Sequence, residues 1–406
     1  MQKEYSFFYR AAALFLLLGI LFIPFPFHFI SFQQAFTEII FGKLIDVTAS
    51  TLFGLQLSST AVHSDSASMY VLVLLLLFLS LLLSSAFSFI SKWKKYQPLL
   101  VQTIYLICTY YIVLLLMKYG LDKVFKTQFY LPEPNTLYTP LGQVDKDLLY
   151  WTSMGTSRLY NMFTGMVEVM AALLLLFKRT RMAGSFIAAA ALLQVVMINF
   201  GFDISVKIFS LFLFCMACFV LAPYMRRLYR AFFTNKEITA TSPEVKPVPG
   251  RDVFINVFIQ CFIAGLLFFE ALYPYLRDNN FNDDSAPRPY LHGAYDVKRM
   301  VVGGDTLSGN SQLIQKFFIH RNGYLIFQDQ EQQMRDYKFD YSDSLNMYVM
   351  TDYQRNKIPV VTKYQEADSV LTLEYIQRGN NIQLTGKMLN WKNLPAVRKG
   401  FHWTTD

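Results

Sequence analysis

Charged residues are scarce in this chain: 16% of its 406 residues are Asp, Glu, Lys or Arg, whereas 53% are hydrophobic. Soluble globular domains carry about 25% charged residues, so this composition excludes an ordinary soluble protein and predicts a membrane protein. The formal net charge of +8 would suit a nucleic-acid-binding protein. However, the basic residues cluster in short connections between apolar runs, and we therefore expect no nucleic-acid partner.

Residues that bind metals and nucleotides are also sparse. The five histidines are scattered along the chain, and none has the spacing of a metal-ligand set. The chain has no glycine-rich phosphate loop of the dinucleotide or P-loop kind, and no nucleophile elbow. We therefore expect neither a bound metal nor a bound nucleotide.

The four cysteines, Cys108, Cys215, Cys218 and Cys261, all lie in apolar runs. The spacing of Cys215 and Cys218 occurs in redox dithiols, but on one continuous helix the two thiols more simply supply small apolar side chains. The polar C-terminal part has no cysteine, so a disulfide cannot hold it together.

Seven apolar runs are long enough to cross the hydrocarbon layer of a membrane, which needs about 20 residues. They are residues 11–29, 69–90, 99–117, 159–177, 182–200, 204–221 and 254–273. Pro24 and Pro26 break or kink the far end of the first run. The apolar piece 36–45 suits a position in the membrane interface, and the long aromatic stretch 118–157 suits a lid or an ordered interfacial segment.

Basic residues predict the orientation of these spans. Two basic residues precede the first span, and three lie between the second and third spans. Three more lie between the fourth and fifth spans, and six between the sixth and seventh. By the positive-inside rule these segments are cytoplasmic. We therefore expect a cytoplasmic N-terminus and a C-terminal domain on the opposite side of the membrane.

Glu168 is a candidate functional residue because it lies deep within an apolar run. It follows the start of span 159–177 by nine residues, hence by roughly 13 Å. A carboxylate at that depth costs roughly 3 kcal/mol on insertion scales, so such acids usually face protein or water. A helix places five polar or small residues within one arc of roughly 80°. These are Arg158, Asn161, Gly165, Glu168 and Ala172.

Several polar residues lie near the predicted outer ends of the spans, and we predict that they line an outward-facing pocket with Glu168 as its floor. The candidate ligand-binding residues are Lys118, Tyr119, Lys123, Arg158, Asn161, Asn199, Asp203 and Lys207. Glu168 is the candidate proton-handling residue of this pocket.

Each candidate also has a structural interpretation. Glu168 can be a structural acid that bonds Asn161, a tyrosine or a lysine within the bundle. Asp203 and Lys207 are spaced i, i+4 and can pair to fix a helix turn. Arg158 can extend its side chain to the outer headgroups.

From residue 278 the composition becomes polar, and strand patterns follow a linker rich in Asn, Asp and Pro. The predicted strands are 295–302, 316–320, 324–328, 337–341, 346–351, 370–376 and 382–388. Two turn signals, Arg321-Asn322-Gly323 and Arg378-Gly379-Asn380, favour hairpins. We expect an antiparallel β domain of six to eight strands, either a small barrel or a curved sheet.

These patterns predict a mainly α polytopic membrane protein with about seven transmembrane helices and a C-terminal β domain. Residues 1–98 would form an N-terminal helix pair with an outer loop, and 99–230 a four-helix membrane core. Residues 231–277 would hold a cytoplasmic linker and the seventh helix, and 278–406 the extracytoplasmic linker and the β domain.

Several motifs in order carry a family resemblance. They are Pro24-Phe25-Pro26-Phe27, the stretches 118–123 (KYGLDK), 128–132 (QFYLP), 160–168 (YNMFTGMVE) and 174–180 (LLLFKRT), and residues 199–207 (NFGFDISVK). Over about residues 10 to 230 the chain resembles DoxX-like integral membrane proteins, especially larger Bacteroidota-type forms with a C-terminal β domain. The resemblance implies a four-helix core with a buried acid in its second helix, at Glu168. Some relatives are linked to thiol redox chemistry and quinone reduction, whereas many have no assigned reaction.

Two functional hypotheses follow. In the first, the core binds a quinone or another lipophilic ligand, Glu168 handles a proton, and Arg158 or Lys118 orients a polar group, while the β domain docks a soluble redox partner. In the second, the protein is a non-catalytic envelope-complex subunit, anchored in the lipid bilayer, whose residues 285–406 recruit partner proteins. A transporter ranks last, because inverted repeats are not evident.

Overall fold

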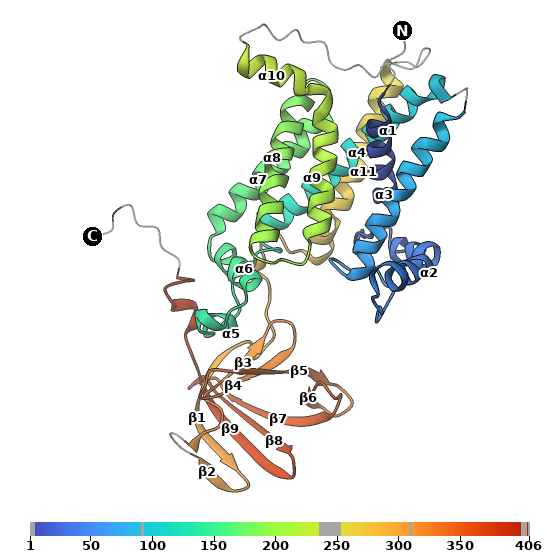
Figure 1. Ribbon diagram of the computed structural model, residues 1–406. Helices are drawn as coiled ribbons and strands as arrows, with labels where there is room; N and C mark the ends of the chain where they lie inside the picture. Colours follow the sequence, from blue (N-terminus) through green and yellow to red (C-terminus); the bar gives the residue numbers. More distant parts are fainter. Residues whose placement is uncertain (1–4, 91–92, 235–252, 308–310, 399–403, 405–406) are drawn as a thin grey trace. The chain divides into compact units, whose positions relative to one another are not determined.

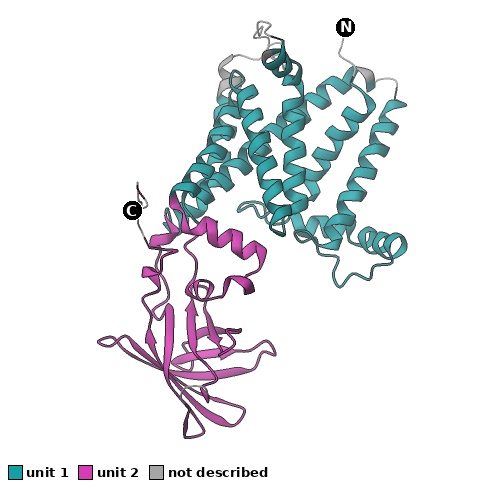
Figure 2. Cartoon of the chain, turned by 60° about the vertical axis from the view of Figure 1, so that its left-hand side comes forward, with its two compact units in different colours: residues 1–128, 159–281 teal, residues 129–158, 282–406 magenta. Residues whose placement is uncertain are grey.

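A computed structural model of the chain describes residues 5–90, 93–234, 253–307, 311–398 and 404 (Figure 1). The chain forms two compact units, one of residues 1–128 and 159–281 and one of residues 129–158 and 282–406 (Figure 2). We call them the helical unit and the barrel unit. Segment 129–158, which we predicted within the four-helix core, thus groups with the β domain. The other predicted boundaries stay predictions.

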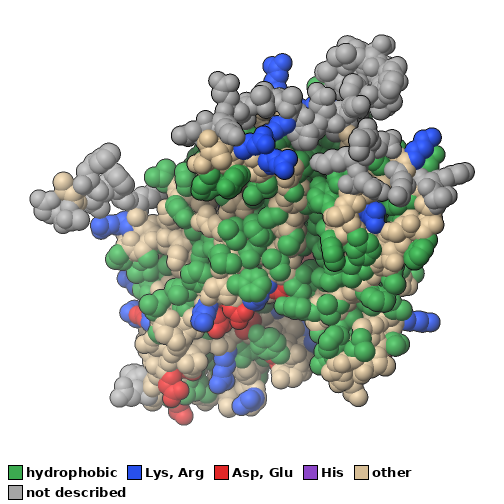
Figure 3. Space-filling model, turned by 45° about the horizontal axis from the view of Figure 1, so that its top comes forward, with side chains coloured by type: hydrophobic (Ala, Val, Ile, Leu, Met, Phe, Trp, Pro, Cys, Tyr) green, Lys and Arg blue, Asp and Glu red, His purple; other side chains and the backbone are tan. Residues whose placement is uncertain are grey.

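The helical unit contains nine α-helices among its described residues. They are α1 (Phe7–Phe22), α2 (Gln33–Phe53), α3 (Ala67–Ser88), α4 (Trp93–Val124), α7 (Arg158–Leu176), α8 (Arg181–Gly201), α9 (Lys207–Leu221), α10 (Met225–Phe233) and α11 (Val253–Asp278). Hydrophobic side chains, green in Figure 3, cover much of the surface that this view presents. Such a surface suits contact with lipid.

Five segments of the described chain are long and apolar enough to cross a membrane. They are Ala67–Ser88, Lys95–Val124, Arg158–Leu176, Arg181–Gly201 and Lys207–Arg230. These segments match the second to sixth predicted spans. The first predicted span corresponds to α1, which has 16 residues, and the seventh to α11. Neither is among the five, so the count of seven is not confirmed.

The predicted orientation also stays a prediction. Five of the basic residues on which it rests lie outside the described part of the chain, namely Lys3, Lys92, Lys236, Lys246 and Arg251. Most of the predicted cytoplasmic linker lies there too.

Helix α1 ends earlier than predicted, because the chain leaves the helix before Pro24 rather than at residue 29. Gln33, the first residue of α2, donates its Nε2 group to two carbonyls near the end of α1, each at 3.0 Å. Thr37 donates to a third at 2.9 Å. The last carbonyls of a helix have no intrahelical partner, so α2 completes the end of α1. The predicted interfacial piece 36–45 is part of this 21-residue helix.

Helix α4 extends further than predicted. It spans 32 residues to Val124, so residues 118–123, which we predicted to begin a loop, form its last two turns. The charged residues of this stretch interrupt the apolar pattern, so the sequence predicts the end of the helix before them. Their charges are paired inside the helical unit, as described below. The rest of the predicted loop contains α5 (Pro134–Leu137), the 3-10 turn η1 (Leu141–Gln143) and α6 (Lys146–Thr156).

Two glycines let α4 and α7 pack with their backbones in contact. A Cβ atom added to Gly165 would lie 2.5 Å from the carbonyl oxygen of Gly120, and one added to Gly120 would lie 2.9 Å from that of Gly165. The predicted face of α7 is confirmed, because Asn161, Gly165, Glu168 and Ala172 are buried. Arg158, the fifth residue of the arc, is exposed.

The barrel unit is built on an antiparallel sheet of nine strands. They are β1 (Gly293–Val302), β2 (Asp305–Leu307), β3 (Lys316–His320), β4 (Tyr324–Gln328), β5 (Met334–Ser342), β6 (Met347–Thr351), β7 (Lys357–Gln365), β8 (Val370–Gln377) and β9 (Asn380–Met388). Strands β3 to β9 pair in sequence order, and β1 pairs with both β3 and β9. Eight strands therefore close into a barrel, and β2 extends the edge of β1 (Figure 1).

The seven predicted strands are confirmed, with ends shifted by a few residues. Both turn signals form hairpin connections, where Gly323, Arg378 and Gly379 have φ angles of +71°, +51° and +79°. The prediction missed β2, which has three residues, and β7. Strand β7 contains Pro359, which weakens the strand signal because proline cannot donate to the ladder.

Aromatic side chains fill the barrel. Tyr295 stacks on Phe317 with ring centroids 4.8 Å apart, and Phe339 stacks on Tyr348 at 4.6 Å. A Cβ atom added to Gly386 would lie 2.5 Å from the Phe317 ring, so this glycine makes room for the aromatic layer. The interior of the barrel is therefore a packed hydrophobic core.

A second, smaller core lies on the outer face of the sheet. Ala294, Phe318 and Ile326 point outward from β1, β3 and β4 and are buried together with Trp391, which follows β9. Side chains of the segment around α5 pack on them, namely Leu131, Leu137 and Tyr138. Segment 129–158 is thus an integral part of the barrel unit.

Candidate functional site

The last two turns of α4 present three charged residues to two other helices. Lys118 and Asp122 are spaced i, i+4 and lie within roughly 40° on the helix, whereas Lys123 lies about 100° further round. The first two face α11 and the third faces α7. We call Lys118, Asp122 and Lys123, together with their partners Glu168, Glu270 and Tyr275, the ionic cluster.

Lys123 holds Glu168 in a buried ion pair. The Nζ atom of Lys123 donates to both carboxylate oxygens of Glu168, at 2.7 and 2.9 Å. The two side chains are only 10% and 6% exposed. The ring of Tyr119 lies 5.8 Å from the same ammonium group. The acid that the sequence singled out is therefore bonded to a lysine within the bundle, as its structural interpretation required.

A second buried ion pair joins α4 to α11. The Nζ atom of Lys118 lies 3.2 Å from the Oε1 atom of Glu270, and both side chains are 11% exposed. The same oxygen accepts a hydrogen bond from the backbone N–H of His28 at 2.9 Å. Phe25 offers its ring face to Lys118 at 5.9 Å. This pair thus connects three parts of the unit: α4, α11 and the segment that follows α1.

Asp122 adds a third connection between α4 and α11. The hydroxyl of Tyr275 donates to its Oδ1 atom at 2.6 Å, and the hydroxyl of Thr127 donates to the same atom at 2.9 Å. Each lysine of the ionic cluster thus has an acidic partner, and Asp122 accepts hydrogen bonds from two hydroxyl groups.

The remaining predicted residues lie elsewhere in the chain. Lys207 pairs with Asp203 at 2.7 Å, which confirms the predicted i, i+4 pair. Asp65, from the segment before α3, accepts hydrogen bonds from the backbone N–H groups of Lys207 and Ile208 at 2.8 and 3.0 Å. It therefore caps the start of α9. These contacts give the Asp203–Lys207 pair a structural role at a helix end.

Three more of the predicted residues lie on α7 and α8. Asn161 is fully buried on α7, and Asn199 is buried near the end of α8. Arg158 begins α7 with an exposed side chain. The outward-facing pocket above Glu168 stays a prediction.

Sequence reasoning missed Glu270, Asp122 and Asp65 as site residues. Glu270 lies inside the apolar run 254–273 and carried the same signal as Glu168, a lone acid in a span. Asp122 was hidden by the prediction of a loop from residue 118. Asp65 had no local signal, because the helix that it caps begins more than 140 residues later.

The barrel unit has its own buried ionic network. Asp283 accepts two hydrogen bonds from the guanidinium group of Arg321, at 2.6 and 2.7 Å, and one from Arg288 at 2.9 Å. The Arg321 guanidinium lies 4.4 Å from the ring centre of Tyr130. Burial opposes the charge of Asp283, but the two arginines outweigh it and hold the pKa of this carboxyl below its usual value.

Glu133 and two histidines extend this network. The Nε2 atom of His292 lies 2.8 Å from the Glu133 carboxylate, which also accepts the backbone N–H of Arg321. Burial opposes the charge of Glu133, but the bond with His292 and the nearby His320 keep its pKa below the usual value. For His320 burial dominates, and it lowers the pKa of the imidazole below 6.5. The network fixes segment 129–158 on the barrel.

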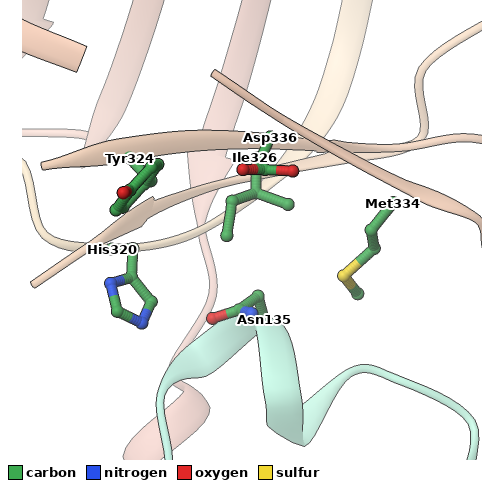
Figure 4. Close-up of a pocket in the computed structure, with 6 residues that line it drawn as sticks. All are labelled: Asn135, His320, Tyr324, Ile326, Met334 and Asp336. Atoms are coloured by element: carbon green, nitrogen blue, oxygen red, sulfur yellow. The ribbon is translucent and has the colours of Figure 1, made fainter. Parts of the chain in front are cut away.

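A hollow of about 340 Å³ lies beside His320 on the outer face of the sheet (Figure 4). Its lining residues are Asn135, His320, Tyr324, Ile326, Met334 and Asp336. Asn135 approaches from α5, and the other side chains come from β3, β4 and β5. The hydroxyl of Tyr353 donates to Asp336 at 2.5 Å, which places a side chain that is 80% exposed next to the hollow.

Metal ligands do not gather in the described part of the chain, where no three His, Cys, Asp or Glu side chains are grouped to hold an ion. Cys215 and Cys218 are free thiols with exposed side chains on α9.

The fold and the two sites define a protein with apolar helices that can cross a membrane and an eight-stranded antiparallel barrel. No family model matches the chain, and no solved structure matches it. Over 88 residues it is 38% identical to the uncharacterized protein YwoB of Bacillus subtilis (strain 168). This match covers 22% of the chain and spans about half, 56%, of the length of YwoB.

Proposed function

We propose that this protein is a membrane-anchored scaffold of the bacterial envelope. Its helical unit is the anchor in the inner membrane, with the N-terminus in the cytoplasm, and its barrel unit recruits partner proteins in the periplasm. The observation that carries the proposal is the hollow on the outer face of the barrel, which combines Tyr324, Met334 and the adjacent exposed Tyr353. Tyrosine and methionine are enriched in protein interfaces.

The interior of the barrel and the ionic cluster support the same proposal. Aromatic and aliphatic side chains pack the interior, so the outer face is the part of the barrel that is free to bind. In the helical unit, Lys118 and Lys123 already have acidic partners at 3.2 and 2.7 Å. Paired charges of this kind hold helices together without any ligand.

Site-specific photo-crosslinking in cells tests the proposal. The full chain is required, because a fragment of residues 285–406 would lack segment 129–158, which covers Phe318 and Ile326 on the outer face. A benzophenone side chain replaces Tyr324 in the hollow. The matched control replaces Ile376, which is 65% exposed on β8.

A specific partner should give a discrete adduct from position 324 and none from position 376. The substitution Asp336→Lys should remove that adduct by changing the charge of the hollow. Equal adducts from both positions, or an adduct that Asp336→Lys leaves unchanged, would contradict the recruiting role of this face.

A second candidate function rests on the resemblance to DoxX-like proteins and on the buried acid. Lys123 donates to both carboxylate oxygens of Glu168 inside the apolar bundle, and in this alternative Glu168 would handle the proton of a bound quinone. The test is quinone binding and reduction by the double variant Glu168→Gln with Lys123→Met, which removes both charges together. A folded double variant that still binds and turns over a short-chain menaquinone analogue would exclude this function.

A further inference from the structure

Helix α10 divides sharply into a basic face and an apolar face. It follows α9 after the 3-10 turn η2 (Ala222–Tyr224). At 100° per residue its three arginines lie within an arc of roughly 100°. They are Arg226, Arg227 and Arg230. The opposite arc of roughly 140° holds only apolar or aromatic side chains, namely Met225, Leu228, Tyr229, Phe232 and Phe233.

Most of the apolar face of α10 is uncovered. Met225, Tyr229, Phe232 and Phe233 are between 53% and 75% exposed. Leu228 packs against the core of the helical unit, and the ring of Phe232 lies 6.4 Å from that of Phe186 on α8. The helix is therefore attached along one edge, and the rest of its apolar side faces outward.

The position of α10 along the chain identifies what covers this face. From Lys207 to Tyr224 the chain rises by roughly 27 Å if it is helical throughout, which is close to the thickness of the hydrocarbon layer, about 30 Å. Pro223 lies in η2, and α10 turns away from the axis of α9 there (Figure 1). The candidate span Lys207–Arg230 is therefore longer than the hydrocarbon layer requires, and its last part, from Met225 onward, reaches the depth of the lipid headgroups.

We propose that α10 is an interfacial helix that binds anionic phospholipid headgroups with its arginines and buries its aromatic face among the upper acyl chains. Its pattern, arginines on one face with phenylalanine and tyrosine on the other, is that of helices that lie in the membrane surface. Basic side chains (blue) also gather near the top of the view in Figure 3, above the hydrophobic surface. Charge complementarity selects anionic over zwitterionic lipid.

The full chain in nanodiscs tests this proposal. A dansyl side chain replaces Phe233, and its emission reports insertion, while lipids brominated near the headgroup quench it if it is inserted. Phosphatidylglycerol is titrated into phosphatidylcholine. We expect blue-shifted, quenched emission that increases with phosphatidylglycerol and weakens at high salt.

The triple substitution Arg226→Gln, Arg227→Gln and Arg230→Gln should lower the affinity for anionic headgroups by at least about tenfold, since each basic residue near an anionic surface contributes a factor of roughly five. The midpoint of the titration should therefore move to a higher phosphatidylglycerol fraction or not be reached. The matched control removes three charges from exposed barrel lysines, Lys298→Gln, Lys338→Gln and Lys363→Gln, and should leave the midpoint unchanged. Circular dichroism of each variant checks that the helices remain folded.

Three outcomes would overturn the proposal. Emission typical of water in every lipid mixture would place α10 away from the bilayer. A midpoint that the arginine substitutions do not move would show that the helix inserts without recognising anionic lipid. Quenching that depends on two copies of the chain per nanodisc, and not on lipid composition, would identify a second copy as the occupant of this face.

Discussion

Removing one partner of the Lys123–Glu168 pair should be among the most destabilising single changes in the helical unit. Both oxygens of Glu168 bond the same ammonium group, and neither side chain is more than 10% exposed. Lys123→Met leaves the carboxylate buried without its partner, and breaking a buried pair in this way costs about 3–5 kcal/mol. Adding Glu168→Met removes the second charge, so the double variant should return to within about 1 kcal/mol of the parent or exceed it.

Unfolding in mixed micelles, with SDS as denaturant and helical circular dichroism as the signal, measures these free energies. Lys178→Met is the matched control in the same unit, because Lys178 is exposed in the connection between α7 and α8. Its change should stay below about 1 kcal/mol. A Lys123→Met variant as stable as this control, or a double variant no better than the single one, would refute the view that the pair is a buried structural lock.

Three further predictions follow from local geometry. Gly165→Ala should destabilise the helical unit by about 1–3 kcal/mol, because its Cβ would overlap α4, whereas Gly201→Ala, with open space around it, should be neutral in the same SDS titration. Asp65→Gly should cost about 1–3 kcal/mol, because it removes the carboxylate that accepts two backbone N–H groups at the start of α9. Asp203→Gly, at a similar positive φ but 78% exposed, should cost less than about 0.5 kcal/mol, and thermal unfolding measures both changes. The barrel should lose stability as pH falls below about 6.5. Burial lowers the pKa of His320 in the folded barrel, so the unfolded chain takes up the proton at a higher pH. His320→Gln should make the free energy of unfolding less dependent on pH, as measured by urea titrations followed by tryptophan fluorescence.

The regular elements were readable because their signals are local. Apolar runs near 20 residues marked the second to sixth spans, and alternating strands with glycine turns marked seven of the nine strands. The failures have local causes too. Residues 118–123 carry charge and were separated from α4, because a single sequence cannot show that their partners lie on α7 and α11.

Barrel closure could not be predicted in the same way. It depends on β1 pairing with β9, which begins 78 residues after β1 ends, and no local pattern specifies that contact. The same applies to the outer core, where Leu131 and Leu137 pack with Phe318 although three candidate spans and α11 separate them from it in the sequence. Long-range pairings of this kind are decided by packing, which composition and periodicity do not report.

The ionic cluster shows why a lone acid in an apolar span is an ambiguous signal. Glu168 and Glu270 are both such acids, and each has a lysine of α4 as its partner. A single Glu168→Gln substitution would leave Lys123 buried without a carboxylate, so lost activity could come from an opened helix contact as readily as from lost chemistry. Only the charge-free double variant separates the two. If it folds and the protein still works, the acid holds α7 against α4; if it folds and function is lost, the pair itself takes part in the function.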